Sequence, residues 1–297
     1  MPEFDVFFKE LLHIAFFRFL ALFAPHVAVR LDASHAPEFL DTEFPTPEAI
    51  HIVDVLASVR LRTGKPGLIH TEVQGQRQAV FPRRMHDYYE DVRRRHSDAT
   101  VYSLAVLLYR TRGAPRTGRF VEERDEEVYH WFEYGIIPLA SLDAQDFLES
   151  ENPVAHGLMG FYRRSGLDPV KLRADSFRNV LRLTEGEPAL RRILLSALER
   201  YFVLTAEQGA RFEQMLARPG YGEVREVLML SEERGMVRGA QNALLDLLRE
   251  KFTDVPGEME GVVRSLESVE EIRPYLRRVL HANTLEEMGF PQDGRAT

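Results

Sequence analysis

Three polar residues in the first third of the chain could together carry hydrolytic chemistry. Asp54 lies inside the apolar segment Ile52–Leu56, and Glu72 and Gln74 stand two residues apart further along the chain. Alternate side chains of a β-strand point to the same face, so Glu72 and Gln74 would project together. Two converging carboxylates repel each other unless a divalent cation lies between them. Oxygen ligands of this kind suit Mg²⁺ or Mn²⁺, which would activate water and neutralise charge on a phosphate.

The spacing of Asp54 and Glu72 also fits a simpler alternative, two exposed acids on a half-solvated sheet. Two neighbouring features favour the functional interpretation. An unpaired charge is costly inside the apolar segment around Asp54. An arginine-rich segment follows Glu72 directly and would supply cations where a phosphodiester needs them.

The segments around these residues predict a β-hairpin that brings them together. Ile50–Arg62 is rich in Val, Ile and Leu, as strands are, and Thr63–Gly67 has the composition of a tight turn. Leu68–Gln74 then returns as the partner strand. If the two strands pair without an odd number of bulges, Asp54 lies on the same face as Glu72.

The predicted elements around this hairpin follow the order of an α/β core. Phe4–Ala24 shows an apolar helical stripe, and Pro82 would open a helix of roughly fifteen residues after the hairpin. Thr100–Tyr109 is a continuous apolar run, which is typical of a buried central strand. Further strands are predicted at Phe39–Phe44 and Glu127–Tyr134. Up to the apolar run, the order is helix, three strands, helix and strand.

Beyond about residue 140 the pattern becomes almost entirely helical. Apolar residues at spacings of three and four predict helices at residues 190–201, 207–216, 223–230, 240–252, 258–267 and 269–281. Gly235 and Gly239 are expected to enclose a link between two of these helices. We therefore predict an α/β domain over residues 1–140, a helical region over 141–234 and a helical C-terminal domain over 235–290. The leucines of 240–252 could support homo-oligomerisation through the C-terminal helices, and packing within that domain is an equal alternative.

The composition is that of an ordinary globular chain of 297 residues, with a net charge of −8 and no cysteine. The lack of cysteine excludes disulfides, thiolate nucleophiles and Cys-based zinc sites, and it fits a cytoplasmic location. The apolar N-terminal segment contains Lys9, Glu10, His13 and Arg18 at intervals that a membrane span would not favour. We therefore expect no membrane partner.

Residues 77–119 form a basic zone inside this acidic chain. The zone has ten arginines, no lysine and four acids, so it carries about +6 and the remainder about −14. A local zone of this kind could bind a polyanion such as DNA. A solvated helix face followed by an arginine-rich loop is the alternative.

Four residues that follow the second hairpin strand could contact a substrate. Arg84 and Tyr88 are four residues apart, so they would share one helix face and could bind phosphate or support the active-site face. An ordinary surface pair is the alternative. Arg77 and Gln78 come directly after the strand and could touch the substrate backbone.

Other side chains could add ligands to the same site. Glu10 in the first helix could supply a third carboxylate, although a solvent-facing position is the alternative. Asp41 and Glu43 share one face of a predicted strand and could also approach the ion. His51 and His70 lie on the hairpin strands, but no HxH or HExxH spacing supports a histidine metal site, so we expect structural histidines.

Taken together, the motifs resemble those of the Rpn/YhgA-like recombination-promoting nucleases, a transposase-like branch of the PD-(D/E)XK superfamily. The N-terminal part of the similarity is carried by Asp5–Leu12, Val53–Leu56, the E-x-Q motif Glu72–Gln74 and Arg84–Tyr88. The tail is similar to a helical C-terminal domain that accompanies such nucleases, over Gly235–Gly239, Leu247–Phe252 and Leu280–Glu287.

The resemblance implies an αβββαβ core and a Mg²⁺- or Mn²⁺-dependent DNA endonuclease with a role in recombination or mobile elements. It implies that Asp54 and Glu72 bind the metal and that Gln74 stands where the superfamily has lysine. An amide can orient water but carries no charge. A catalytically inactive nuclease-fold protein that binds nucleic acid or other proteins is the alternative. An RNA nuclease with the same site is a third possibility.

Overall fold

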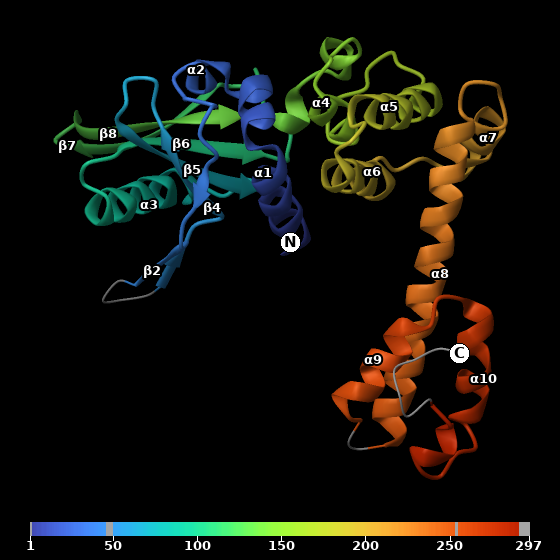
Figure 1. Cartoon of the computed structure of the whole chain (residues 1–297). Helices are drawn as coiled ribbons and strands as arrows, with labels where there is room; N and C mark the ends of the chain where they lie inside the picture. Colours follow the sequence, from blue (N-terminus) through green and yellow to red (C-terminus); the bar gives the residue numbers. More distant parts are fainter. Residues whose placement is uncertain (1, 46–49, 253–254, 291–297) are drawn as a thin grey trace. The chain divides into compact units, whose positions relative to one another are not determined.

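The structure is a computed structural model that describes residues 2–45, 50–252 and 255–290. Its internal contacts divide the chain into two compact units, Met1–Arg218 (unit 1) and Pro219–Thr297 (unit 2), which are drawn in Figure 1. The domain boundaries predicted near residues 140 and 234 stay predictions, because compactness by itself does not measure independent folding.

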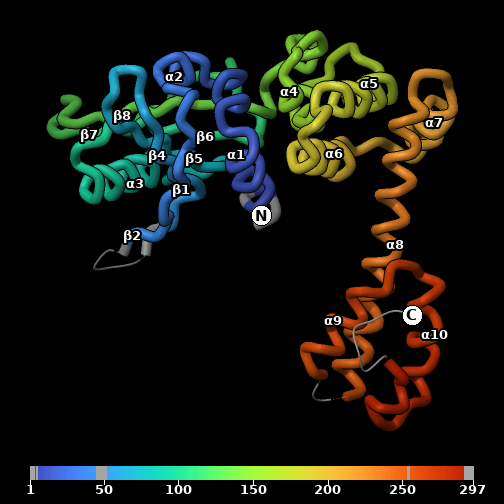
Figure 2. Tube along the Cα trace, in the orientation of Figure 1, coloured from blue at the N-terminus to red at the C-terminus, as the bar shows by residue number. Residues whose placement is uncertain are grey.

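Unit 1 is built on a six-stranded mixed sheet with the order β1-β4-β5-β6-β8-β7, so the predicted α/β class is confirmed. In the trace of Figure 2, β5 and β6 run through the middle of this sheet. β5 pairs antiparallel with β4 and parallel with β6. The strands are β1 (Glu38–Phe39), β4 (Val55–Arg60), β5 (Pro66–Gln74), β6 (Thr100–Leu107), β7 (Thr117–Arg124) and β8 (Glu127–Ile137). A separate pair joins β2 (Glu43–Pro45) to β3 (Ile50–Ile52).

Two of the predicted strands are wrong in their extent. The expected single strand Phe39–Phe44 is two short strands, β1 and β2, which belong to different sheets. The expected strand Ile50–Arg62 is interrupted at Val53 and Asp54, which separate β3 from β4. An aspartate favours such a break because its carboxylate competes with the backbone for hydrogen bonds.

Strand β7 was not predicted, whereas the strands predicted at Leu68–Gln74, Thr100–Tyr109 and Glu127–Tyr134 are present as β5, β6 and β8. Most side chains of β7 are exposed, so the strand shows little of the apolar alternation that identifies a strand from sequence. The predicted turn at Thr63–Gly67 is confirmed, with Gly64 at φ +81°, a backbone conformation that favours glycine. The buried strand expected at Thr100–Tyr109 is β6, whose residues 103–107 are buried.

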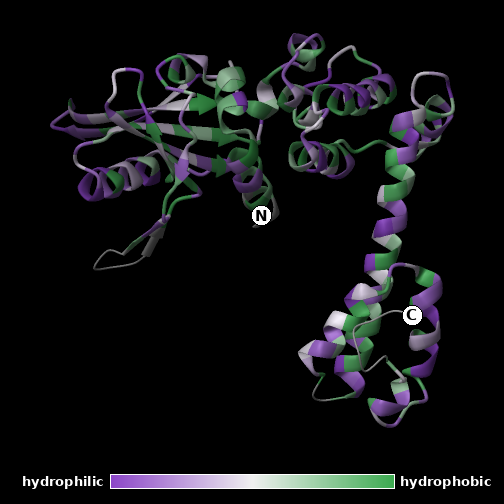
Figure 3. Cartoon of the chain, in the orientation of Figure 1, coloured by the Kyte–Doolittle hydropathy of each residue, from purple (hydrophilic) through white to green (hydrophobic). Residues whose placement is uncertain are grey.

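Helix α3 (Phe81–Arg95) covers one face of the sheet and begins one residue before the expected Pro82. Leu68 of β5 packs in one apolar cluster with Val92 of α3. Gln74, six residues after Leu68 and therefore on the same face of β5, accepts a hydrogen bond from Arg84 of α3. The face of β5 that carries Glu72 is therefore the face that α3 covers. In Figure 3 the central strands are largely coloured hydrophobic and α3 is mixed, as expected for a surface helix over a sheet.

Helix α1 (Pro2–Phe23) confirms the predicted N-terminal helix and contacts β5, α4 and α6. Packing on several sides explains why its side chains are apolar almost all round, with Phe8, Leu11, Leu12 and Phe19 fully buried. No helix among the described residues combines the length and apolarity that crossing a membrane requires.

The remainder of unit 1 is helical, as predicted. The predicted helices at 190–201 and 207–216 correspond to α6 and α7, whereas α5 was not predicted. Asp168 and Thr205 cap α5 and α7 by accepting hydrogen bonds from backbone N–H groups of the first turn. The helical elements are α2 (Pro25–Ala28), η1 (Leu139–Ser141), η2 (Ala144–Phe147), α4 (Pro153–Gly157), α5 (Pro169–Leu183), α6 (Pro188–Tyr201) and α7 (Ala206–Leu216).

Unit 2 consists of α8 (Gly222–Lys251), α9 (Gly257–Ser265), α10 (Val269–Arg278) and the turn η3 (Glu286–Met288). The link expected between Gly235 and Gly239 is wrong, since α8 continues through both glycines. A glycine inside a helix costs only about 1 kcal/mol, which a long helix tolerates. Leu244, Leu245 and Leu248 are buried in the core of unit 2, which is the packing alternative considered for the leucines of 240–252.

Candidate active site

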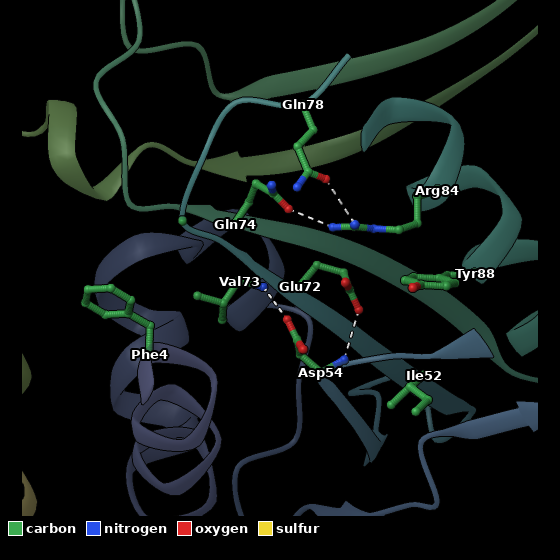
Figure 4. A pocket seen from close by; sticks show the side chains of 10 residues that line it. Phe4, Ile52, Asp54, Glu72, Val73, Gln74, Gln78, Arg84 and Tyr88 are labelled. Carbon is green, nitrogen blue, oxygen red and sulfur yellow. Dashed lines mark hydrogen bonds between the residues drawn. The ribbon is translucent and has the colours of Figure 1, made fainter. Parts of the chain in front are cut away.

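Asp54 lies at the break between β3 and β4, directly across from Glu72. Val55 pairs with Thr71, so the same antiparallel register places Asp54 opposite Glu72. The Asp54 backbone N–H donates to Glu72 Oε1 at 2.9 Å, and the Val73 N–H donates to Asp54 Oδ2 at 2.7 Å. Each carboxylate therefore accepts a backbone hydrogen bond from the neighbouring segment at the point where the strand ladder ends. The structure brings the two carboxylates together, as Figure 4 shows.

Glu72 is only 3% exposed, which is unusual for a carboxylate. His70 Nε2 lies 3.2 Å from Glu72 Oε1, and His70 Nδ1 lies 3.3 Å from Ser103 Oγ. A carboxylate accepts, so Nε2 is the nitrogen that carries the proton if Glu72 is ionised. The fully buried His70 thus fixes the orientation of Glu72, which is the structural role expected for this histidine.

Gln74 is buried beside Glu72 and both ends of its amide are engaged. Its Oε1 accepts from Arg84 Nη2 at 2.7 Å, and its Nε2 donates to the Gln76 carbonyl. Arg84 Nη1 also donates to Gln78 Oε1 at 3.3 Å. Arg84 Nε is buried and has no hydrogen-bond partner among the described residues. The guanidinium lines the cavity and each of its two Nη atoms carries two N–H donors, so it can also donate to an anion there.

Tyr88 closes the same pocket from α3 and its ring lies edge-on to that of His70, at 5.9 Å between centroids. Burial raises the pKa of Tyr88, and the negative charges of Glu72 and Asp54 raise it further, while Arg84 partly offsets them. The phenol therefore stays protonated throughout the neutral range and can donate a hydrogen bond to an anionic substrate.

These side chains surround a cavity of about 260 Å³ that opens at the end of β5. Figure 4 shows Asp54 and Glu72 in the middle of the site, with Arg84 and Tyr88 from α3 on one side and Phe4 from α1 on the other. The lining residues are Phe4, Ile52, Asp54, Glu72, Val73, Gln74, Gly75, Gln78, Arg84 and Tyr88. The cavity is large enough for an ion and the phosphate group that it would bind.

Two residues that we predicted for the site do not line this cavity. Glu10 forms an ion pair with Arg192 of α6, so its carboxylate is engaged away from Asp54. Arg77 is exposed just beyond β5, and its neighbour Gln78 lines the cavity instead.

Asp41 and Glu43, two further candidate ligands, do not line the cavity. Asp41 and Glu43 are both exposed, and Asp41 Oδ1 accepts the Glu43 backbone N–H at 3.0 Å. The side chain of His51 lies outside the described part of the chain. Sequence reasoning missed Ser103, Phe4 and Ile52. Ser103 had a usable signal, because a hydroxyl within an apolar strand needs a partner.

The donor set of the cavity fits a hard divalent cation bound through few protein ligands. Asp54 and Glu72 supply two carboxylates, and the described residues contain no group of three His, Asp or Glu side chains arranged to hold an ion. Mg²⁺ commonly uses one or two carboxylates and completes its shell with water and substrate phosphate. A site formed by Asp54 and Glu72 alone therefore suits Mg²⁺ or Mn²⁺ better than zinc, which prefers three or four protein ligands.

The arginines of residues 77–119 do not form one uniform surface. Arg93 and Arg95 donate to backbone carbonyl groups near β2 and β6, and Arg94 pairs with Asp91. Positive charge in the last turn of α3 also stabilises that helix end. Arg84 is the arginine of this zone that reaches the cavity, whereas the exposed members are Arg77, Arg83, Arg94, Arg95, Arg110, Arg112, Arg116 and Arg119.

Comparison of the chain with protein-family models, with curated protein sequences and with solved structures found no match. The resemblance to Rpn/YhgA-like nucleases therefore depends on the motifs of the chain itself.

Proposed function

We propose that the chain is a metal-dependent DNA endonuclease with a PD-(D/E)XK-type site, similar to the Rpn/YhgA-like nucleases. The observation that carries the proposal is the placement of Asp54 and Glu72 side by side in a cavity that also receives Arg84. Carboxylates beside a guanidinium are suited to a substrate that brings both a cation and a phosphate.

The order of the elements supports the same proposal. Helix α1 is followed by the acidic hairpin of β4 and β5, then by α3 over the face of Glu72 and by β6 parallel to β5. This order supports the αβββαβ arrangement that the resemblance implies, if β1, which pairs with β4, is counted as its first strand. In this arrangement the E-x-Q motif lies at the end of a central strand, where the neighbouring strands and α3 hold it rigidly.

Asp54 and Glu72 would hold Mg²⁺ or Mn²⁺ through their carboxylate oxygens. When bound, such an ion lowers the pKa of a coordinated water and neutralises charge that develops on the phosphate. The chain's own residues would orient the reactants. His70 fixes Glu72, and Gln74 holds the guanidinium of Arg84 toward the cavity. Arg84 and the neutral phenol of Tyr88 would donate hydrogen bonds to the scissile phosphate.

The proposed substrate is the DNA backbone, with little dependence on base sequence. Arginine contacts to phosphates give an affinity that falls steeply with salt, because bound cations are released from DNA when the protein binds. The exposed arginines around α3 and β7 are candidates for these contacts. A role in recombination or mobile elements is the part of the proposal that comes from the resemblance alone.

The test is nicking of supercoiled plasmid by the purified chain with Mg²⁺ or Mn²⁺, and with the chelator EDTA. We expect Asp54→Asn and Glu72→Gln to lower the rate at least 100-fold, because they remove charge but keep the side-chain size. Asp98→Asn, at an exposed loop position before β6, is the matched control and should nick like the unchanged protein. Equal rates for all four proteins would exclude Asp54 and Glu72 as metal ligands.

A second candidate, an inactive nuclease-fold protein that binds nucleic acid or protein, is favoured by one observation. The amide of Gln74 is hydrogen-bonded at both ends, so Arg84 and the Gln76 carbonyl, and not a catalytic water, fix its orientation. This candidate would bind DNA and show no nicking at any metal concentration. Parallel assays with single-stranded RNA would separate an RNA nuclease from both candidates.

A further inference from the structure

A second group of potential metal ligands lies on the other side of α3, away from Asp54 and Glu72. His86 of α3 and His130 of β8 approach each other with their Nε2 atoms 3.1 Å apart. His86 points toward β7 and β8, and it stacks on Phe120 at 4.9 Å between ring centroids. Arg84 and Tyr88, two positions to either side, line the candidate active site instead. The pair is therefore a separate feature of the fold.

The distance between the two nitrogens is close to that of two ligands on one ion. Zinc binds histidine nitrogen at 2.0–2.1 Å in tetrahedral geometry, which separates two ligand atoms by about 3.3 Å. The ring centroids are 5.0 Å apart and the ring planes are inclined at 68°, so the rings meet through their Nε2 edges without stacking. Without an ion, one Nε2 must carry a proton and the other must accept it.

The carboxylate of Glu90 lies close enough to His86 to be a third ligand. Glu90 lies one helical turn after His86, and its Oε1 is 4.0 Å from His86 Nε2. A shift of less than ~1 Å would bring it to ligand spacing. The Glu90 side chain is 51% exposed, so such a shift meets little packing resistance. The need for this movement explains why the described residues show no group of three already arranged around an ion.

The surroundings of His86 resemble those of a metal-binding imidazole. Its other nitrogen, Nδ1, lies 3.5 Å from Asp87 Oδ1, an acceptor that favours a proton on Nδ1 and leaves the Nε2 lone pair available. Phe120 stacks on the ring and Phe132 meets it edge-on, at 4.9 and 5.6 Å between centroids. A carboxylate that accepts from Nδ1 makes the imidazole a better ligand, and apolar neighbours limit the access of solvent to it.

We infer that His86, His130 and Glu90 form a binding site for a transition-metal ion such as Zn²⁺, distinct from the Mg²⁺ or Mn²⁺ site of the proposed function. Two imidazoles and one carboxylate are ligands that suit Zn²⁺, Ni²⁺ or Cu²⁺ and that Mg²⁺ disfavours. The ion would join α3 to β8 and so fasten the edge hairpin of β7 and β8 over the helix that carries Arg84.

The site can be tested in full-length protein that carries Asp54→Ala and Glu72→Ala, so that the candidate active site contributes no ligand. Zn²⁺ is titrated calorimetrically into this tag-free protein, with Mg²⁺ present in large excess. We expect one bound Zn²⁺ per chain and no competition by Mg²⁺. Adding His86→Asn or His130→Asn should weaken binding at least tenfold, and adding Glu90→Gln should weaken it by a smaller factor.

His26→Asn, at an exposed position on α2, is the matched control and should leave the Zn²⁺ affinity unchanged. Thermal unfolding gives an independent readout, because Zn²⁺ should raise the Tm of the parent protein but not that of the His86→Asn, His130→Asn double variant. If a histidine variant does not fold, the exposed Glu90→Gln variant still provides the comparison. Unchanged Zn²⁺ affinity in the double variant, or displacement of Zn²⁺ by Mg²⁺, would overturn the inference whether or not the protein nicks DNA.

Discussion

At the residue scale, the cavity joins side chains that serve the fold and side chains that can serve a substrate. Asp54 and Glu72 accept backbone hydrogen bonds that extend the β4–β5 ladder, and their charges also face the cavity. Arg84 donates to two amide oxygens, and its buried Nε has no partner within the described part of the chain. Substitutions at these residues are therefore expected to change both stability and activity, so each variant needs a measurement of folding beside the measurement of activity.

Arg84 offers such a separation. We expect Arg84→Gln to lower the single-turnover nicking rate about 10- to 100-fold, since it removes a charge-assisted hydrogen bond to phosphate worth ~1.5–3 kcal/mol. Arg84→Lys should recover only part of this loss, because lysine keeps the charge and loses the planar fork. The exposed neighbour Arg83→Gln is the control, and an equal loss there would mean that only the general charge of α3 matters.

The buried phenol of Tyr134 predicts that the stability of the protein depends on pH in the alkaline range. Burial raises the pKa of Tyr134 to about 12, while the unfolded chain keeps a value near 10. The folded state therefore binds the proton more tightly, and its contribution to stability is complete below pH 10 and is lost as pH rises toward 12. We expect the free energy of unfolding to fall by about 1.4 kcal/mol from this group between pH 9 and pH 11.

The measurement is urea unfolding at both pH values for the unchanged protein and for Tyr134→Phe, which keeps the ring and removes the titrating group. Between pH 9 and pH 11, the free energy of unfolding of Tyr134→Phe should fall by about 1.4 kcal/mol less than that of the unchanged protein. Tyr129→Phe, at an exposed position of the same strand, should behave like the unchanged protein. An identical pH dependence for Tyr134→Phe would show that this phenol does not titrate abnormally.

At the element scale, α8 is one helix although its sequence contains two glycines. Apart from the neighbouring residues and backbone of α8 itself, a Cβ atom added at Gly235 or Gly239 would meet no described atom within 4 Å, so these positions have room for alanine. Gly289, which ends the last turn, is different because its φ is +64° and a Cβ would lie 2.7 Å from Arg278 Nη1. Identical substitutions should therefore have opposite effects in unit 2.

We expect Gly235→Ala and Gly239→Ala each to raise the stability of unit 2 by up to about 1 kcal/mol and to increase the far-ultraviolet helical signal. Gly289→Ala should lower stability by about 1 kcal/mol or more, since the left-handed backbone is strained for alanine. Thermal and urea unfolding followed by circular dichroism checks both. Loss of stability at Gly235 and Gly239 would instead support a non-helical link.

At the scale of the whole molecule, the negative net charge of the chain opposes DNA binding, so the proposed function requires positive charge concentrated near the cavity. The chain carries −8, and DNA is a polyanion, so contacts must come from arginines close to the cavity. Residues 219–297 contain 15 acidic and 10 basic side chains, which leaves residues 1–218 with a net charge of −3. The cavity and all its lining residues lie in unit 1.

We therefore expect the fragment 1–218 to fold, to keep metal-dependent nicking and to bind DNA at least as tightly as the full chain at low salt. Circular dichroism, plasmid nicking and fluorescence anisotropy at several salt concentrations check the three parts. A folded fragment without nicking, compared with an active full chain, would assign unit 2 a direct part in the reaction.

Local chemistry made much of the fold predictable from the sequence. The hairpin at Thr63–Gly67, α1, α3 and β6 follow from turn composition, apolar periodicity and an apolar run, which act over a few neighbouring residues. β7 and the continuity of α8 were not predictable in this way. β7 is specified by pairing with β8 despite its exposed, charged sequence, and the glycines of α8 are tolerated because the rest of the helix is strongly helical.

For the candidate site, the sequence predicts the shared face of Glu72 and Gln74 from strand alternation, and it predicts Asp54 on that face only if the hairpin pairs without an odd number of bulges. Arg84, Tyr88 and Gln78 were candidates from their positions in the chain, but their contacts in the cavity follow from tertiary packing. Arg84 reaches the site from α3 and Phe4 from α1, while His70 contacts Glu72 from the same strand, β5. Glu10 forms an ion pair with Arg192 and does not line the cavity. Such contacts depend on how distant elements pack, and no local pattern in the chain encodes that packing.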